Sequence, residues 1–149
     1  MKLTDVKIAI NSKLKGLYPD IKIYGKEIHQ GYVAPCFFSY LVSQPRTHSN
    51  KNFEQGGITV KILYFQEIKD EADQLRKVDE IFELFEKTIT IGDRVIEVKE
   101  REFDYVGEKN DILEITLKIP FLENNYKEPD VESATSYKVN IKEGKNEST

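Results

Sequence analysis

The stretch that decides the fold is ILEITLKIPF, residues 112–121. Apolar and polar side chains alternate along it, which is typical of a β-strand with one buried and one solvated face. The stretch ITVKILYF, residues 58–65, alternates in the same way. The side chains expected on the buried face are Ile58, Val60, Ile62, Tyr64, Leu113, Ile115, Leu117 and Ile119. Two strands of this kind predict a sheet that turns one face toward a core.

Working outward, further strands are predicted on both sides of this pair. Residues 21–24, 27–32 and 94–103 read as extended segments. The stretch CFFSYLV, residues 36–42, is apolar on both faces and predicts a central strand covered on two sides. A turn through Gly107, Asn110 and Asp111 should join the last two strands into a hairpin.

Two helices are predicted from apolar spacing. Residues 4–17 are capped by Thr4 or Asp5 in this prediction, and residues 70–88 carry acid-before-base pairs on the solvated side, Asp73 with Lys77 and Glu83 with Lys87. The apolar stripes are Val6, Ile10, Leu14 and Leu17 in the first helix and Leu75, Val78, Phe82, Phe85 and Ile89 in the second. Across all elements, we expect a buried core that contains Val6, Ile10, Leu14, Phe37, Ile62, Phe82, Phe85, Ile115 and Leu117.

Together these elements predict an α+β fold, a mostly antiparallel sheet with two helices packed on one face. Residues 44–57 are polar and rich in turn-forming residues, so they predict a long hairpin loop between two strands. We expect residues 1–122 to form the α+β domain and residues 123–149 to form an extended C-terminal extension outside the core.

Composition excludes several classes of protein. The chain has 149 residues, with 22 basic and 26 acidic ones interspersed along it, so a phosphate-binding stripe for nucleic acid is not expected. No apolar run approaches the roughly 20 residues that cross a bilayer, and the N-terminus does not resemble a signal peptide. The single cysteine, Cys36, cannot form an intrachain disulfide and suits a protein made in a reducing cytoplasm.

No residue pattern points to catalysis, a cofactor or a metal. The spacing of His29, His48 and Cys36 does not match a zinc site, and Cys36 is expected to be a buried small hydrophobe. The acidic run Glu97, Glu100, Glu102 and Asp104 could serve acid–base chemistry, but a charge run usually marks a solvated face. The pair Gly56-Gly57 lacks the residues of a phosphate loop. The aromatic pairs 37–38 and 64–65 could stack nucleic-acid bases, but without basic neighbours they are expected in the core.

Three segments are candidates for contacts with other proteins. Arg46, Lys51 and Phe53 lie in the predicted loop, and Glu100, Glu102 and Asp104 share one face of a predicted strand. In the extension, YKVNI at 137–141 alternates, so one strand face would carry Tyr137, Val139 and Ile141. Such a strand could add to a sheet edge of a neighbouring subunit or of a connector protein.

Several stretches resemble a small family of tail terminator proteins from phages and prophages of Gram-positive bacteria. They are DIKIYGKEIHQGY at 20–32 followed by PCFF at 35–38, LTDVKIAIN at 3–11, and the strand at 58–65 that leads into an acidic helix. The resemblance covers roughly residues 1–121 and involves structural residues, without a catalytic motif.

The resemblance implies a structural role in a virion or tailocin particle, made in the bacterial cytoplasm. Tail terminators form a ring, typically hexameric, on the head-proximal end of the tail tube. The ring stops tube polymerisation and presents a surface to the neck or connector protein, and to the sheath protein where the tail is contractile. The residues alone also leave open a different protein-interaction adaptor or assembly chaperone, and an enzyme whose site the sequence does not reveal.

Overall fold

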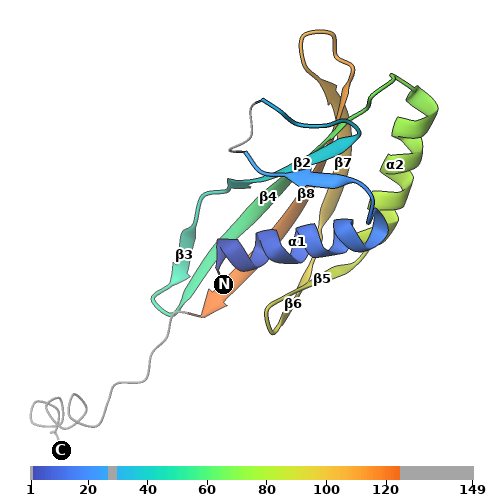
Figure 1. The fold of residues 1–149 in the computed structure, drawn as a ribbon. Helices are drawn as coiled ribbons and strands as arrows, with labels where there is room; N and C mark the ends of the chain where they lie inside the picture. Colours follow the sequence, from blue (N-terminus) through green and yellow to red (C-terminus); the bar gives the residue numbers. More distant parts are fainter. Residues whose placement is uncertain (1, 27–29, 125–149) are drawn as a thin grey trace, which may run out of the picture.

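In the computed structural model, which describes residues 2–26 and 30–124, the chain forms one large sheet, one small sheet and two helices (Figure 1). The large sheet has the strand order β1-β2-β4-β8-β7, and β3 also pairs with β4. The elements are α1 Leu3–Leu17, β1 Lys22–Tyr24, β2 Cys36–Ser43, β3 Thr47–Asn50, β4 Phe53–Phe65, α2 Glu71–Leu84, β5 Thr88–Ile91, β6 Arg94–Glu97, β7 Glu100–Val106 and β8 Ile112–Asn124. Every pairing is antiparallel except β1 with β2.

The two strands that the sequence pointed to, β4 and β8, are the centre of the sheet. Their register runs from Phe53 opposite Asn124 to Tyr64 opposite Leu113. This register places the two predicted apolar rows side by side, and all eight side chains are buried. The prediction that these alternating side chains form one buried face of the sheet is therefore confirmed.

Both helices pack on the same face of the large sheet, which confirms the α+β prediction (Figure 1). Helix α1 buries Val6, Ile10 and Leu14 against it, and the β5–β6 hairpin fills the space beside α1 with further buried apolar side chains. We call this side the covered face. Of the nine predicted core residues, eight are buried and Phe82 is only partly buried.

The opposite side, here called the bare face, carries no helix in the part of the chain that the structure describes. Its central residues are Tyr40, Lys61, Leu63, Glu114, Thr116 and Lys118. Strand β2 shows the difference between the two sides. Phe37 on the covered face is fully buried, whereas Val42 on the bare face is 42% exposed. At the start of the strand the bare-face side is covered as well, because Cys36 is fully buried there. The prediction that this strand is covered on both sides therefore holds for its first residues and fails toward its end.

The predicted helix ends differ from those observed. Helix α2 ends at Leu84, and Ile89 lies in β5, which the sequence did not predict. The buried side of α2 is formed by Gln74, Lys77, Val78 and Ile81, so the predicted stripe member Leu75 is 42% exposed. The pair Asp73 and Lys77 does form, at 3.0 Å, but Lys77 is buried and does not lie on a solvated side. The residue before α1 is Lys2, and no side chain caps this helix.

The predicted loop 44–57 is largely β-structure. Strand β3 pairs with the start of β4, which begins at Phe53, five residues before the predicted strand. The glycine pair does not break β4 because side chains from elsewhere cover it. A Cβ on Gly56 would lie 3.1 Å from the Phe121 ring, and one on Gly57 would lie 2.4 Å from the Gln44 side-chain oxygen.

Three other strand boundaries also change. The predicted strand 94–103 is divided between the two sheets, because Val98 N–H donates to the carbonyl of Lys87 and Lys99 N–H donates to that of Lys118. Strand β8 continues to Asn124, beyond the predicted end at Phe121. In the predicted segment 27–32, residues 30–32 form no strand, and residues 27–29 lie outside the described part. The predicted division between residues 122 and 123 stays a prediction.

Candidate protein–protein interface

The bare face carries a row of charged side chains across three strands. Lys61 Nζ lies 3.2 Å from Glu114 Oε1, and Lys118 Nζ lies 3.6 Å from Glu100 Oε1 and 3.8 Å from Glu102 Oε1. Asp104 is opposite Glu114 in the register. Four carboxylates therefore face two ammonium groups, which leaves a surplus of two negative charges at the β7 side of the sheet.

Strand β7 is the last strand of the large sheet, so its outer side is a sheet edge. Glu100, Glu102 and Asp104 are all exposed on its bare-face side, as the sequence predicted. On its covered-face side, Phe103 lies 6.4 Å from the Phe82 ring in α2 and is still 42% exposed. An edge with acidic groups on one side and an exposed ring on the other is suited to contact another protein.

The far end of the sheet forms an arm, which we define as residues 46–57, with β3 and the start of β4, and residues 120–124 of β8. It extends beyond the helices, away from the compact body (Figure 1). The guanidinium of Arg46 lies 5.4 Å from the Phe121 ring centre and 3.9 Å from Glu54 Oε1, so Arg46 holds the base of the arm. Lys51 is exposed in the turn at the tip, and Phe53 beside it is half-buried.

The third predicted contact segment, with Tyr137, Val139 and Ile141, lies outside the described residues. The structure thus places Arg46, Lys51 and Phe53 on the arm and the acidic row on a different edge. The predicted residues do not converge on one site. Sequence reasoning missed that β7 is an edge strand, because strand order depends on long-range pairing that no local pattern reveals.

A buried polar network holds α2 on the covered face. Lys77 is only 8% exposed, and its ammonium group lies 5.1 Å and 5.2 Å from the ring centres of Tyr18 and Tyr64. The Tyr64 hydroxyl donates a 2.7 Å hydrogen bond to Asp73, and Gln66 Nε2 donates to the same carboxylate at 2.8 Å. The carboxylate of Asp73 is therefore the acceptor at the centre of the network.

These contacts perturb several pKa values. Burial acts to raise the pKa of Asp73, but hydrogen bonds from Tyr64, Gln66 and Lys77, with the Lys77 charge, lower it to about 2. Burial and the bond to Asp73 raise the pKa of Tyr64, and burial with a bond to Glu80 raises that of Tyr18. The donors Tyr18, Tyr64, Gln66 and Lys77 all have acceptors within the fold, so the network serves to hold α2 against the sheet.

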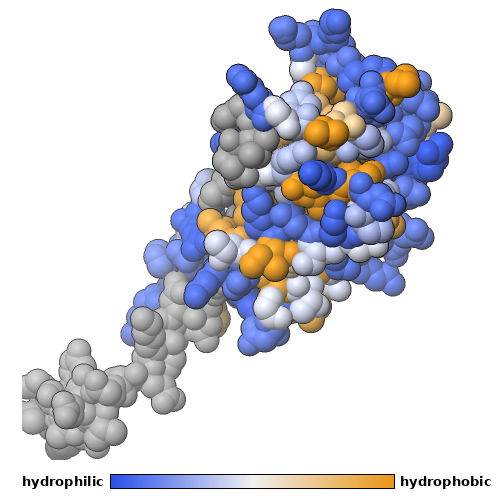
Figure 2. Space-filling view, in the orientation of Figure 1, coloured by the Kyte–Doolittle hydropathy of each residue, from blue (hydrophilic) through white to orange (hydrophobic). Residues whose placement is uncertain are grey.

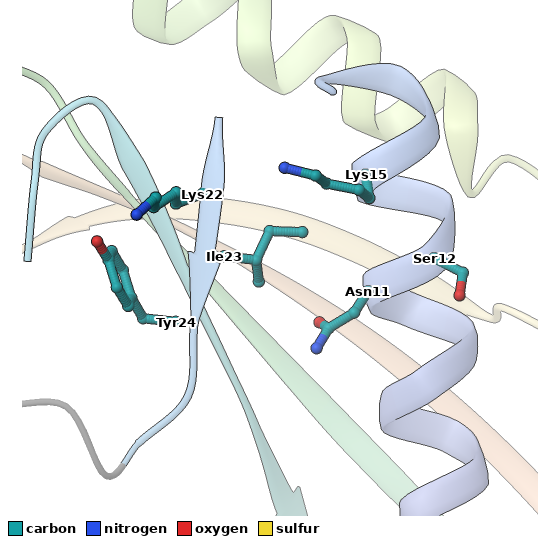
Figure 3. Close-up of a pocket in the computed structure, with 6 residues that line it drawn as sticks. All are labelled: Asn11, Ser12, Lys15, Lys22, Ile23 and Tyr24. Atoms are coloured by element: carbon teal, nitrogen blue, oxygen red, sulfur yellow. The ribbon is translucent and has the colours of Figure 1, made fainter. Parts of the chain in front are cut away.

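The surface hollows do not assemble a reactive group. The groove between α1 and β1 has a volume of about 450 Å³, and Asn11, Lys15 and Ile23 point into it (Figure 3). Asn11 Oδ1 accepts a 2.7 Å hydrogen bond from Ser39, and Lys15 Nζ donates to the carbonyl of Ile21. Figure 2, which looks onto the α1 side, shows mainly hydrophilic residues with separate apolar patches. Among the described residues visible in this view, hydrophilic side chains separate the apolar patches from one another.

The predicted chemical candidates are dispersed. The thiol of Cys36 is buried, and burial raises its pKa, which disfavours the reactive thiolate. His48 lies on β3 in the arm, and His29 is outside the described part. Within residues 2–26 and 30–124, no group of three His, Cys, Asp or Glu side chains is arranged to hold a metal ion. Neither described helix is long and apolar enough to span a membrane.

The aromatic pairs of the sequence divide between the two faces. Phe37 and Tyr64 are buried on the covered face, with ring centres 5.1 Å apart. Phe38 and Phe65 lie on the bare face, where their rings pack against each other and against Tyr32 at 5.1–5.3 Å. The expectation that both pairs lie in the core is therefore confirmed for Phe37 and Tyr64, whereas Phe38 and Phe65 are half-buried and pack outside it.

The chain is similar to solved structures and matches the profile of one protein family. None of the curated proteins compared with the chain matches it. One solved structure is 12% identical, with a TM-score of 0.48, and the match covers 87% of this chain and 99% of the other. A chain from a structure described as the virion of a native gene transfer agent particle is 13% identical, with a TM-score of 0.46, and the match covers 77% and 91%. At such low identities and TM-scores, neither likeness carries an argument about function.

The sequence profile of one family, described as phage tail terminator protein, matches residues 5–131. The matched range includes nearly all of α1 and every strand of both sheets. It also includes the arm and the β7 edge, the two places where the described structure presents candidate contact surfaces. The chain therefore belongs to the phage tail terminator protein family, whose members are structural proteins of phage tails.

Proposed function

We propose that this protein is a tail terminator that forms a closed ring, a hexamer, on the head-proximal end of a tail tube. In this role it stops tube polymerisation and offers a surface to the neck or connector protein, and to the sheath protein if the tail is contractile. The observation that carries the proposal is the family match over residues 5–131.

The geometry supports a ring. A closed ring needs a heterologous interface, in which two different surfaces of each subunit meet. The arm and the edge of β7 are two such surfaces, and they lie on different strands of the same sheet. Their side chains also differ, because the arm carries Arg46 and Lys51 whereas the β7 edge carries an acidic row.

The proposal predicts a defect in tail length when the protein is missing. Particles assembled without the chain should contain tails of variable and excessive length that do not join heads. Cryo-electron microscopy of complete particles should show the chain as a ring at the head end of the tube. A single copy per particle, or an open filament of copies, would falsify the ring.

Analysis of purified particles also distinguishes a tail terminator from an assembly chaperone. An assembly chaperone would be required for tails but absent from purified particles, whereas a terminator would remain in them. Lys51→Glu with Phe53→Ala, both at the tip of the arm, should reduce incorporation into tails. Lys2→Glu with Ile8→Ala, which changes an exposed charge and an exposed apolar side chain on α1, is the matched control and should be incorporated normally.

A further inference from the structure

The outer edge of β7 is the longest strand edge that the described fold leaves without a partner. β7 has seven residues, and no described strand pairs with its outer side. The other free edges are shorter. Residues 119–124 of β8 and 39–43 of β2 extend beyond their outer neighbours, β5 and β6 have four residues each, β1 has three, and β3 has four with a register shift between His48 and Asn50. An edge of seven residues is long enough to accept an added strand.

The two sides of this edge specify what such a strand must carry. On the bare-face side it needs positive charge, because the row Glu100, Glu102 and Asp104 is exposed and only Lys118 bridges two of its members. On the covered-face side it needs apolar groups, because Phe103 is 42% exposed beside the half-buried Tyr105. A matching strand would therefore alternate basic or polar residues with apolar ones.

The chain contains one such segment beyond the described residues, YKVNIK at 137–142. We propose that residues 137–142 of a second copy of this chain add as a strand to the outer edge of β7. Lys138 and Lys142 then lie beside the acidic row, and Tyr137, Val139 and Ile141 lie on the side of Phe103. This pairing rests on the proposed function in one respect, because it forms the β7 part of the subunit contact of the ring, made by the segment that follows the arm of the neighbouring copy.

Charge makes the pairing selective. Two β7 edges would bring their acidic rows together, and like charges directly opposite each other destabilise a strand pair. The acidic row therefore opposes β7–β7 association, a common protection of exposed edges. The β1 edge carries Lys22, so it would repel the lysines of the segment instead of attracting them.

The length of chain outside the structure permits contact with a neighbour. Strand β8 ends at Asn124, six residues beyond Lys118, which is opposite the first residue of β7. Residues 125–136 then lie between β8 and the segment, and twelve extended residues reach at most about 40 Å. The segment can therefore reach another subunit. The same length also lets the segment pair with the β7 edge of its own chain, so the test must distinguish pairing within one chain from pairing between two chains.

Cysteine pairs test the contact directly, using the full-length protein and assembled particles. One variant carries Glu102→Cys in the middle of the acidic row, and a second carries Asn140→Cys on the lysine side of the segment. Mixing the two should give a heterodimeric disulfide, because facing Cβ atoms on paired strands lie about 4.5–5.5 Å apart. The native Cys36 is fully buried and should not compete. Lys22→Cys, exposed at the opposite edge of the sheet, is the matched control and should not cross-link with Asn140→Cys.

The outcomes are distinct. A heterodimer in solution or in particles supports the proposal. A third variant carries both Glu102→Cys and Asn140→Cys in one chain. If it forms an intramolecular cross-link while the mixture of single variants gives no heterodimer, the segment pairs with the β7 edge of its own chain and the proposal is overturned. No cross-link in solution or in particles also overturns it. A ring that persists in particles after residues 125–149 are removed contradicts this inference alone, whereas the absence of the chain from the tail contradicts the proposed function.

Charge reversal tests the specificity. Lys138→Glu with Lys142→Glu should lower the yield of cross-linked dimer about tenfold, because favourable exposed pairs become repulsive. Glu100→Lys with Asp104→Lys in the partner chain, which keeps the cysteine at position 102, should restore the yield. Lys2→Glu with Lys87→Glu makes the same change of net charge at exposed sites elsewhere and should leave the yield unchanged. If Lys2→Glu with Lys87→Glu lowers the yield of cross-linked dimer as much as Lys138→Glu with Lys142→Glu does, net charge controls association and the β7 edge does not.

Discussion

Neighbouring residues of β8 show how differently the two faces of the large sheet are built. Leu117 points to the covered face and is fully buried between the helices and the sheet. Lys118 points to the bare face and lies between two carboxylates of β7, with 38% of its side chain exposed. Stability of the fold should therefore depend mainly on the covered face. Substitutions on the bare face should correspondingly change stability little.

Two substitutions at neighbouring positions of β8 compare the contributions of the two faces to stability. Leu117→Ala should lower the free energy of unfolding by about 2–5 kcal/mol, because it removes a fully buried side chain and leaves a cavity. Lys118→Ala should change it by less than about 1 kcal/mol, since exposed ion pairs contribute little. Urea unfolding of both variants measures the difference. Similar losses for both would show that the bare face is also part of the core.

Two aromatic side chains at the C-terminal end of α2 differ in burial within the covered face. Phe85 is fully buried at the end of the helix, so Phe85→Ala should cost about 3–5 kcal/mol. Phe82 is only partly buried beside Phe103, so Phe82→Ala should cost clearly less. The sequence analysis placed both residues in the buried core without distinguishing them. Equal measured losses would contradict the difference in burial that the structure shows.

The polar network under α2 should have the next largest effect. Asp73→Ala removes the acceptor of Lys77, Tyr64 and Gln66 and leaves a buried ammonium group unpaired. The expected loss is about 2–4 kcal/mol, somewhat less than for a fully buried pair because Asp73 is partly exposed. Asp79→Ala removes an exposed acid from the same helix and is the control, with an expected change within about 0.5 kcal/mol. Matching losses would mean that helix charge, and not the network, is responsible.

The same carboxylate predicts acid sensitivity. The pKa of Asp73 is lowered from 3.8 to about 2 in the folded protein, so its contribution to stability is present above pH 3.8 and is lost as the pH falls toward 2. Unfolding free energy measured against pH should fall less steeply over this window in Asp73→Ala than in the native protein. Parallel curves would show that other carboxylates cause the acid response.

Strands in which apolar and polar residues alternate made much of the fold predictable. The features that were predicted wrongly depend on contacts between residues distant in the sequence. Strand β8 could be recognised because its alternating side chains reflect its two faces directly. The loop predicted at 44–57 was wrong because Gly56-Gly57 resembles a turn locally, whereas Phe121 and Gln44 cover the pair only in the folded sheet.

The burial of α2 could not be read from hydrophobicity alone for the same reason. Its buried side includes Gln74 and Lys77, whose partners are distant in sequence. Gln74 donates to the carbonyl of Asp111, and Lys77 lies against the rings of Tyr18 and Tyr64. The acidic face of β7 was predictable, but its position at an edge was not, because strand order is set by pairing.

A smaller effect is expected from the charged row of the bare face. Glu114→Gln removes the ion pair with Lys61, but it also removes the like-charge opposition to Asp104. These changes act in opposite directions, so the net change in unfolding free energy should be below about 1 kcal/mol. Measurement at low and high salt tests the balance, because salt screens both terms. A loss above 2 kcal/mol, on the order of a buried pair, would place this ion pair among the structural elements of the fold.

The last comparison concerns two tyrosines on the covered face, one with and one without a hydrogen-bond acceptor for its hydroxyl. The Tyr64 hydroxyl donates to Asp73, so Tyr64→Phe should cost about 1.5–3 kcal/mol, as for a hydrogen bond to a charged group. The Tyr105 hydroxyl is buried without a hydrogen-bond partner among the described residues. Removing an unsatisfied buried hydroxyl relieves its desolvation penalty, so Tyr105→Phe should leave stability unchanged or raise it by up to about 1 kcal/mol. Thermal unfolding of the two matched variants compares them directly. A loss for Tyr105→Phe as large as that for Tyr64→Phe would show that the hydroxyl has a partner in solution, and that the β7 side of the covered face is held as firmly as its centre.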